Sequence, residues 1–263
     1  MIKKELKFNL KSFLIWTSIL VGMFLVVFLV YPFIITDDTV KNLDEMMKVF
    51  PKELLKSFNM DITSINTVFG WLKSEGFMFA LIIIGLYSSI LGSNILLKEE
   101  YDKTIEYLSF VPINRKKILL NKVIISLIYI ISMVLIVGIF NYIGLLLSGD
   151  FNQKQYLLLS ITPLLIGLPL FSINLFISTI LHKNKKSIGL SLGLVFMFYL
   201  LTILSELSDK INFLKYFTIY TLADTRNIIS NASLNPLLII ISIIITTLFI
   251  ILSMLKYNKK ELI

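Results

Sequence analysis

Residues 237–255 read LLIIISIIITTLFIILSML, an unbroken run of 19 residues without a charge. The hydrocarbon core of a bilayer is about 30 Å thick and takes roughly 20 apolar residues as an α-helix. Strands of a membrane barrel alternate apolar and polar residues, and this run does not. A helix also satisfies its backbone hydrogen bonds within the segment, as hydrocarbon requires. The run therefore predicts a membrane-spanning helix.

Five other segments share this character, because each is free of Asp, Glu, Lys, Arg and His. The predicted spans are residues 13–35, 77–97, 123–147, 156–181, 187–205 and 237–255. The composition agrees, since 56% of the residues are hydrophobic and 16% are charged, against about 45–50% and about 25% in soluble domains. The sequence thus predicts an all-α polytopic membrane protein, with residues 1–263 forming a single transmembrane domain.

The distribution of basic residues predicts the topology. The N-terminal segment, residues 98–122, residues 182–186 and the C-terminal segment hold 16 of the 25 Lys and Arg residues. The alternate loops (36–76, 148–155 and 206–236) hold the other 9 and most of the acidic residues. By the positive-inside rule both termini are cytoplasmic, as expected of a cell-membrane protein. The net charge of +8 therefore reports topology and does not indicate a nucleic-acid partner.

The predicted spans contain none of the groups on which ion-driven transport usually depends. A proton relay or voltage sensor needs ionisable residues inside the membrane, and the spans have none. The only histidine, His182, lies in a short basic loop, and no Cys is present. These features predict no catalytic group, metal site or cofactor in this chain. A phosphate-binding loop needs a Gly-Lys pair, which the sequence lacks, so energy for uphill transport would have to come from another polypeptide.

Residues 98–122 form the most distinctive polar segment. It is acidic first, then short and amphipathic, then broken by Pro112, which ends a helix. Asp102 or Thr104 can cap the short helix, and Asn114 can cap the next one. The apolar face of the short helix consists of Ile105, Leu108 and Val111. Long basic side chains able to reach the lipid headgroups follow: Arg115, Lys116, Lys117 and Lys122.

This order of residues resembles the first cytoplasmic loop of ABC-2 type transporter permeases. That pattern has a Glu, then Gly-Thr, a second Glu, a Leu, a Pro-x-Ser-Arg turn and a downstream Lys. The matching residues are Glu99, Thr104, Glu106, Leu108, Pro112, Arg115 and Lys122. Lys103 stands where the family often has Gly, and Asn114 stands where it often has Ser.

The resemblance implies a fold and a set of partners. It implies a coupling helix between the second and third spans that docks on a separate P-loop ATPase subunit, where ATP and Mg would bind. It also implies a second copy of this permease, or a paralogue, in the same membrane. The residues expected to serve ATPase coupling are Glu99, Glu100, Thr104, Glu106, Leu108, Pro112 and Arg115.

Two long loops lie on the predicted outer side. Residues 36–76 carry apolar residues at helical spacing and predict amphipathic helices at the interface, which could cap the bundle, gate substrate exit or bind a peptide. For residues 206–236 the family resemblance implies short re-entrant helices. Tyr216 and Tyr220 within them fit an interfacial aromatic belt.

Small and polar residues inside the spans predict how the helices meet. Small residues four apart permit close approach of helices, and they occur at Gly85, Ser88, Ser89, Gly92, Ser93, Gly189 and Gly193. Pro163 and Pro169 should kink the fourth span. The three most polar residues, expected to make interhelical hydrogen bonds, are Asn94, Asn141 and Asn174.

The leading hypothesis is the permease subunit of an ATP-driven exporter of an amphipathic, lipidic or peptide substrate, with no enzymatic activity of its own. Two alternatives stay open. One is an ABC-linked sensor or immunity protein that binds an extracellular peptide through residues 36–76. The other is a stand-alone secondary transporter or channel.

Overall fold

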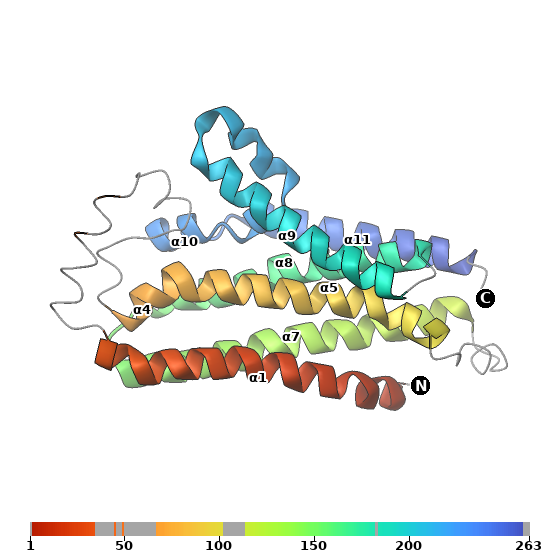
Figure 1. Ribbon diagram of the computed structural model, residues 1–263, viewed down its shortest axis with the longest axis horizontal. Helices are drawn as coiled ribbons and strands as arrows, with labels where there is room; N and C mark the ends of the chain where they lie inside the picture. The colour runs from red at the N-terminus through yellow and green to blue at the C-terminus, as the bar shows by residue number, and fades with distance from the viewer. Residues whose placement is uncertain are drawn as a thin grey trace.

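Six long helices dominate the computed structural model, which describes residues 2–34, 45, 49, 67–101, 114–181 and 184–259 (Figure 1). They are α1 (Ile2–Ile34), α5 (Phe77–Tyr101), α7 (Arg115–Ser148), α8 (Gln153–Ile180), α9 (Asn184–Leu207) and α11 (Pro236–Asn258). Each corresponds to one predicted span, and each is long and apolar enough to cross a membrane. Within the described ranges the regular structure is helical, without strands, so the all-α prediction with six candidate spans is confirmed.

The helices are longer than the predicted spans because polar residues outside the apolar runs cap them. The Asn114 side chain accepts a hydrogen bond from the Lys116 amide at the start of α7, as the sequence predicted. Asn152 caps α8 in the same way, and Asn235 caps α11, whose first residue is Pro236. Helix α1 begins at Ile2, well before the apolar run that starts at residue 13, so the basic N-terminal segment is helical.

Helices α5 and α8 form the centre of the bundle and are the most buried of the six. Helices α1 and α7 pack on one side of this pair, and α9 and α11 on the other. The start of α1 and the end of α11 lie at the same end of the bundle (Figure 1). Exposed apolar side chains cover the outer faces of α1, α7, α9 and α11, as expected for surfaces that contact lipid.

Short helices close the opposite end of the bundle. Before α5 come α4 (Val68–Trp71) and the π-helical turn η1 (Leu72–Gly76), and Thr67 caps α4. Between α9 and α11 come the 3-10 helices η2 (Asp209–Phe217) and η3 (Tyr220–Ala223), followed by α10 (Thr225–Asn231). Helix η2 folds back along α9 (Figure 1). Short helices between the last two spans are what the family resemblance implied for residues 206–236.

The small residues of α5 allow its close approach to α8. A Cβ on Gly92 would lie 2.4 Å from the Phe171 carbonyl oxygen, and one on Gly167 would lie 2.9 Å from the Ser88 hydroxyl oxygen. The predicted role of the α5 glycines and serines is therefore confirmed. Gly189 and Gly193 of α9 were expected to act likewise, but both are exposed and face no atom of this chain within 4 Å. That prediction is wrong within the described chain, because α9 turns them away from the bundle.

Gly92→Ala should lower the free energy of unfolding by about 2 kcal/mol, because the new methyl group must push the α8 backbone away. The matched control is Gly22→Ala in α1, where a Cβ would meet nothing within 4 Å. The control should be neutral or slightly stabilising, since Ala favours helix over Gly. Unfolding of both variants in mixed detergent micelles measures the difference, and equal stability would refute the close packing at Gly92.

The intramembrane asparagines behave differently from one another. Asn94 of α5 accepts a hydrogen bond of 2.9 Å from the Asn184 side chain of α9, which confirms the interhelical prediction. The Asn174 amide instead donates to the Leu170 carbonyl of its own helix, at 2.8 Å. The carbonyl oxygens of Asn141 and Asn174 are buried without a hydrogen-bond partner among the described residues. The interhelical prediction therefore holds for Asn94 and is wrong for the Asn174 amide.

Candidate functional site

The described flanks of the predicted coupling segment, which are the end of α5 and the start of α7, lie at the end of the bundle where α1 starts and α11 ends (Figure 1). Helix α5 continues to Tyr101, so Glu99 and Glu100 belong to its last turn. Arg115 is the first residue of α7 and is exposed. The other predicted coupling residues, Thr104, Glu106, Leu108 and Pro112, lie outside the described residues, as does His182. Two continuous helices thus lead into and out of the segment.

A buried ion pair holds three helices together at this end. The Lys122 Nζ of α7 lies 2.8 Å from the Glu5 Oε1 of α1. The same Nζ donates a hydrogen bond of 3.0 Å to the Ile95 carbonyl of α5. The side chains of Lys122 and Glu5 are 1% and 11% exposed. We call this set of three residues the Glu5–Lys122–Ile95 clamp.

The clamp corrects one expectation. Lys122 was expected to extend to the lipid headgroups, whereas it is buried and paired with Glu5. Both residues lie outside the predicted spans 13–35 and 123–147, which carry no charge, yet α1 and α7 bring both side chains into the packed interior at this end. The physical reason is that each group supplies the partner that the other needs, and burial of an unpaired charge costs far more.

Further contacts join the same elements around the clamp. The Lys98 Nζ of α5 lies 3.1 Å from the centroid of the Phe8 ring of α1, a cation–π arrangement. The Tyr129 hydroxyl of α7 donates a hydrogen bond to the Leu6 carbonyl of α1. The Asn94–Asn184 bond adds the start of α9. A displacement of either helix flanking residues 102–113 would therefore be felt by α1 and α9 as well.

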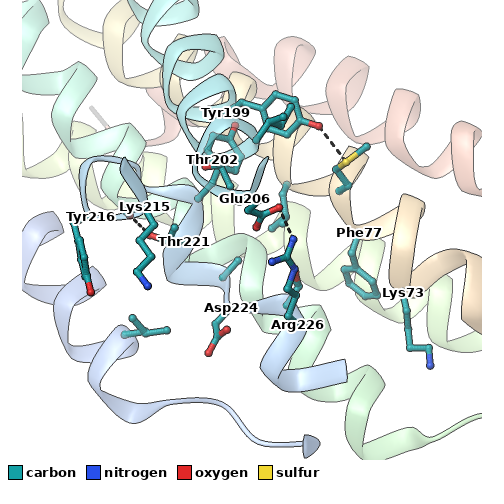
Figure 2. Close-up of a pocket in the computed structure, with 17 residues that line it drawn as sticks. Lys73, Phe77, Tyr199, Thr202, Glu206, Lys215, Tyr216, Thr221, Asp224 and Arg226 are labelled. Carbon is teal, nitrogen blue, oxygen red and sulfur yellow. Dashed lines mark hydrogen bonds and ion pairs between the residues drawn. The ribbon is translucent and has the colours of Figure 1, made fainter. Parts of the chain in front are cut away.

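A cavity of about 430 Å³ opens at the opposite end of the bundle (Figure 2). The sequence did not predict it, because its lining comes from seven separate elements. Apolar residues of α5, α9 and α11 form one part of its wall, and charged residues of η1, α9, η2 and α10 form another. The charged lining residues are Lys73, Glu206, Lys215, Asp224 and Arg226.

An ion pair crosses the middle of this cavity. The Arg226 guanidinium donates to the Glu206 carboxylate at 2.5 Å. In Figure 2 the pair lies between Lys215 and Asp224 on one side and Phe77 and Lys73 on the other. Tyr220, expected in an interfacial aromatic belt, is instead buried with its ring 5.7 Å from that of Tyr199. Burial raises the pKa of the Tyr220 phenol above its usual range. Tyr216 is exposed, as the belt requires.

Near the cavity, Glu75 of η1 carries a carboxylate oxygen that is buried without a hydrogen-bond partner among the described residues. Burial raises the pKa of this carboxyl group because it disfavours the ionised form. Because the pKa of Glu75 is higher in the folded protein than in the unfolded chain, the folded state is favoured while the carboxyl group is protonated, below its unfolded-state pKa. This contribution to the free energy of unfolding is lost as the pH rises through the folded-state pKa.

Glu75→Gln should therefore raise the free energy of unfolding at neutral pH by about 1 kcal/mol, since it removes a poorly solvated charge. The gain should shrink as the pH falls and Glu75 becomes protonated. Thermal unfolding in detergent across the acidic to neutral range measures both effects. Asp150→Asn, at an exposed position of the same end, is the control and should change little. A gain that is independent of pH would contradict the explanation.

Comparison with protein families identifies the class to which this architecture belongs. The family model described as "ABC-2 family transporter protein" matches residues 1–262. The chain therefore belongs to the ABC-2 transporter family and is a membrane permease of that class, as the resemblance of residues 98–122 indicated. No curated protein and no solved structure matches the chain significantly.

Proposed function

We propose that this chain is the permease subunit of an ATP-driven exporter, coupled to a separate P-loop ATPase through residues 98–122. Membership of the ABC-2 family supports the transport role. The absence of a Gly-Lys pair supports the placement of ATP and Mg on a partner subunit. The end of the bundle that carries residues 98–122 is assigned to the cytoplasm because its loops are the more basic ones.

The observation that carries the proposal is the way α5 and α7 flank residues 102–113. Both helices are continuous from the membrane interior to the edges of this segment. The Glu5–Lys122–Ile95 clamp joins them to each other and to α1. Helices are stiff, so a partner that moves the segment would move α5 and α7 together. ATP-driven closure of a soluble subunit needs such a mechanical connection to reach the bilayer.

The proposed cargo is amphipathic, lipidic or peptidic. The predicted spans carry no charge, and a second permease, either a copy of this chain or a paralogue, would contribute the other half of the transport path. Asn94, Asn141 and Asn174 are the strongest polar groups within these spans, which favours an uncharged or weakly polar passage over one for ions.

Purification of the full-length chain from its native membrane tests this function. We expect it to retain a P-loop ATPase subunit, identified by mass spectrometry, and the complex to hydrolyse ATP in a vanadate-sensitive manner. Flux driven by an ion gradient in liposomes that contain the chain alone would instead favour a secondary transporter or channel.

Deletion of Asn42–Phe58 separates the exporter from a sensor or immunity protein. If the deletion abolishes binding of an extracellular peptide while ATPase association stays intact, and no transport accompanies ATP hydrolysis, the chain acts as a sensor. For an exporter we expect transport to depend on ATP whether or not the loop binds peptide.

A further inference from the structure

The cavity in Figure 2 lies at the level where the membrane spans end. Its lining includes Phe77, the first residue of α5, Glu206 near the end of α9, and Leu238 near the start of α11. Because the apolar stretches of such helices match the hydrocarbon thickness, their ends mark the boundary between acyl chains and headgroups. A ligand of this cavity is therefore in contact with both regions of a bilayer.

The apolar part of the cavity is formed in part by α9 and α11. Helix α9 packs on α5, whereas α11 packs on α8. Ile203 of α9 and Leu238 of α11 both line the cavity, and Leu81 of α5 adds to the same apolar surface. Exposed apolar side chains of α9 and α11 lie close by in the sequence, at Leu200, Leu204, Leu237 and Ile240. A hydrocarbon chain thus has apolar surface on both helices along which it can enter the cavity from the bilayer.

The charged part of the site is balanced between basic and acidic residues. Five of the six charged residues line the cavity, and the sixth, Glu75, interacts electrostatically with the lining residue Tyr199. The basic residues are Lys73, Lys215 and Arg226, and the acidic residues are Glu75, Glu206 and Asp224. The site therefore has no excess charge that would attract a simple anion or a simple cation.

The Arg226–Glu206 ion pair is the charged feature that a ligand would contact. It crosses the middle of the cavity, and its two side chains are 37% and 22% exposed. A neutral ligand that displaced water from this pair would leave both charges less well solvated, which costs free energy. A ligand that carries a negative and a positive group side by side supplies an opposite charge to each partner instead. The pair therefore favours a zwitterionic ligand.

We propose that this cavity binds a zwitterionic phospholipid with a primary ammonium group, such as phosphatidylethanolamine. The phosphate accepts hydrogen bonds from the Arg226 guanidinium, whose planar set of donors suits phosphate oxygens, and the ammonium group donates to the Glu206 carboxylate. The beginning of one acyl chain lies against Leu81 and Leu238. The cavity volume of about 430 Å³ lies within the usual range for small-molecule sites, about 300–1,000 Å³. This site does not depend on the transport function proposed above.

Lipid counting by native mass spectrometry tests the site and its selectivity. The full-length chain is delipidated in non-ionic detergent and titrated with phosphatidylethanolamine, phosphatidylcholine or phosphatidylglycerol of the same acyl chains. We expect one saturable phosphatidylethanolamine per chain and binding of the other two lipids that is at least about tenfold weaker. The quaternary ammonium group of phosphatidylcholine has no hydrogen to donate to Glu206, and phosphatidylglycerol has no positive group.

Two variants remove different parts of the site. Glu206→Gln/Arg226→Gln removes both charges of the pair, so it should weaken phosphatidylethanolamine binding by about tenfold or more and abolish the preference among headgroups. Leu238→Trp fills the apolar part and leaves the charges in place, and it should also weaken binding. The matched control is Asp150→Asn/Lys185→Gln, which removes one exposed acidic and one exposed basic group elsewhere and should change nothing.

Four outcomes would overturn the proposal. Equal binding of phosphatidylcholine or phosphatidylglycerol would show that the ion pair does not select the headgroup. Unchanged binding in Leu238→Trp would place the lipid elsewhere on the chain, and this variant keeps the test decisive if the Gln variant fails to fold. Equal losses in the Gln variant and the control would show a general effect of surface charge. If glycerophosphoethanolamine, which lacks acyl chains, bound as tightly as the lipid, the apolar wall would play no part.

Discussion

Lys122→Met should lower the free energy of unfolding by about 3 kcal/mol, one of the largest effects expected for any single substitution in this chain. Methionine preserves most of the side-chain volume but leaves the Glu5 carboxylate, 11% exposed, without the ammonium group 2.8 Å away. It also removes the hydrogen bond to the Ile95 carbonyl. Detergent-titrated unfolding of the full-length chain measures the loss.

The double variant Glu5→Gln/Lys122→Met is the matched control. Because it removes both charges, it should recover a large part of the stability that the single variant loses, since neutral replacement of a buried ion pair is often tolerated. Lys117→Met, which removes an exposed cation of the same helix, should have little effect. If Lys122→Met were as stable as Lys117→Met, the Glu5–Lys122–Ile95 clamp would not hold the helices together.

Reversal of the acidic coupling residues should have the largest effect on function. We expect Glu99→Lys/Glu100→Lys/Glu106→Lys to weaken association with the ATPase by about 100-fold or more, because charges that are matched in the complex would become repulsive. ATP-dependent transport should be lost with it. Association is measured by co-elution of the purified subunits, and transport by its sensitivity to vanadate.

The control for charge reversal uses the predicted outer side. Asp37→Lys/Asp38→Lys/Asp150→Lys changes the net charge by the same amount in loops 36–76 and 148–155. This variant should bind the ATPase like the unaltered chain. Equal binding by both triple variants would contradict the assignment of coupling to residues 98–122, and equal loss in both would point to a general effect of charge on assembly.

Apolar length was sufficient to predict the fold. Each of the six uncharged runs, from residues 13–35 to residues 237–255, forms one of the six long helices. In hydrocarbon a single segment can satisfy all of its backbone hydrogen bonds within itself only as a helix. The cap at Asn114 was also predictable, since it depends on neighbouring residues alone. Gly92 marked a close contact, whereas Gly189 and Gly193 did not. The same spacing of small residues has different outcomes in α5 and α9, because the sequence does not say which face of a helix contacts a neighbouring helix.

The Glu5–Lys122–Ile95 clamp could have been inferred in part. Glu5 is the only acidic residue before the first span, and it lies on the same helix face as Asn9 and Phe13, both buried. That spacing indicates a carboxylate directed toward the bundle. The partner, 117 residues away, could not be identified, because the pairing of α1 with α7 depends on tertiary packing. The charged cavity was unpredictable for the same reason, since seven elements contribute to it.

The proposed function requires an ATPase subunit to dock on the segment between α5 and α7. A photo-crosslinking amino acid at position 106, introduced in the full-length chain in its native membrane, tests this contact directly. We expect a crosslinked product that contains a P-loop ATPase, and no such product when the same group replaces Asp150 at the opposite end of the bundle. An ATPase adduct from position 150, or none from position 106 in a chain that still co-purifies with the ATPase, would contradict it.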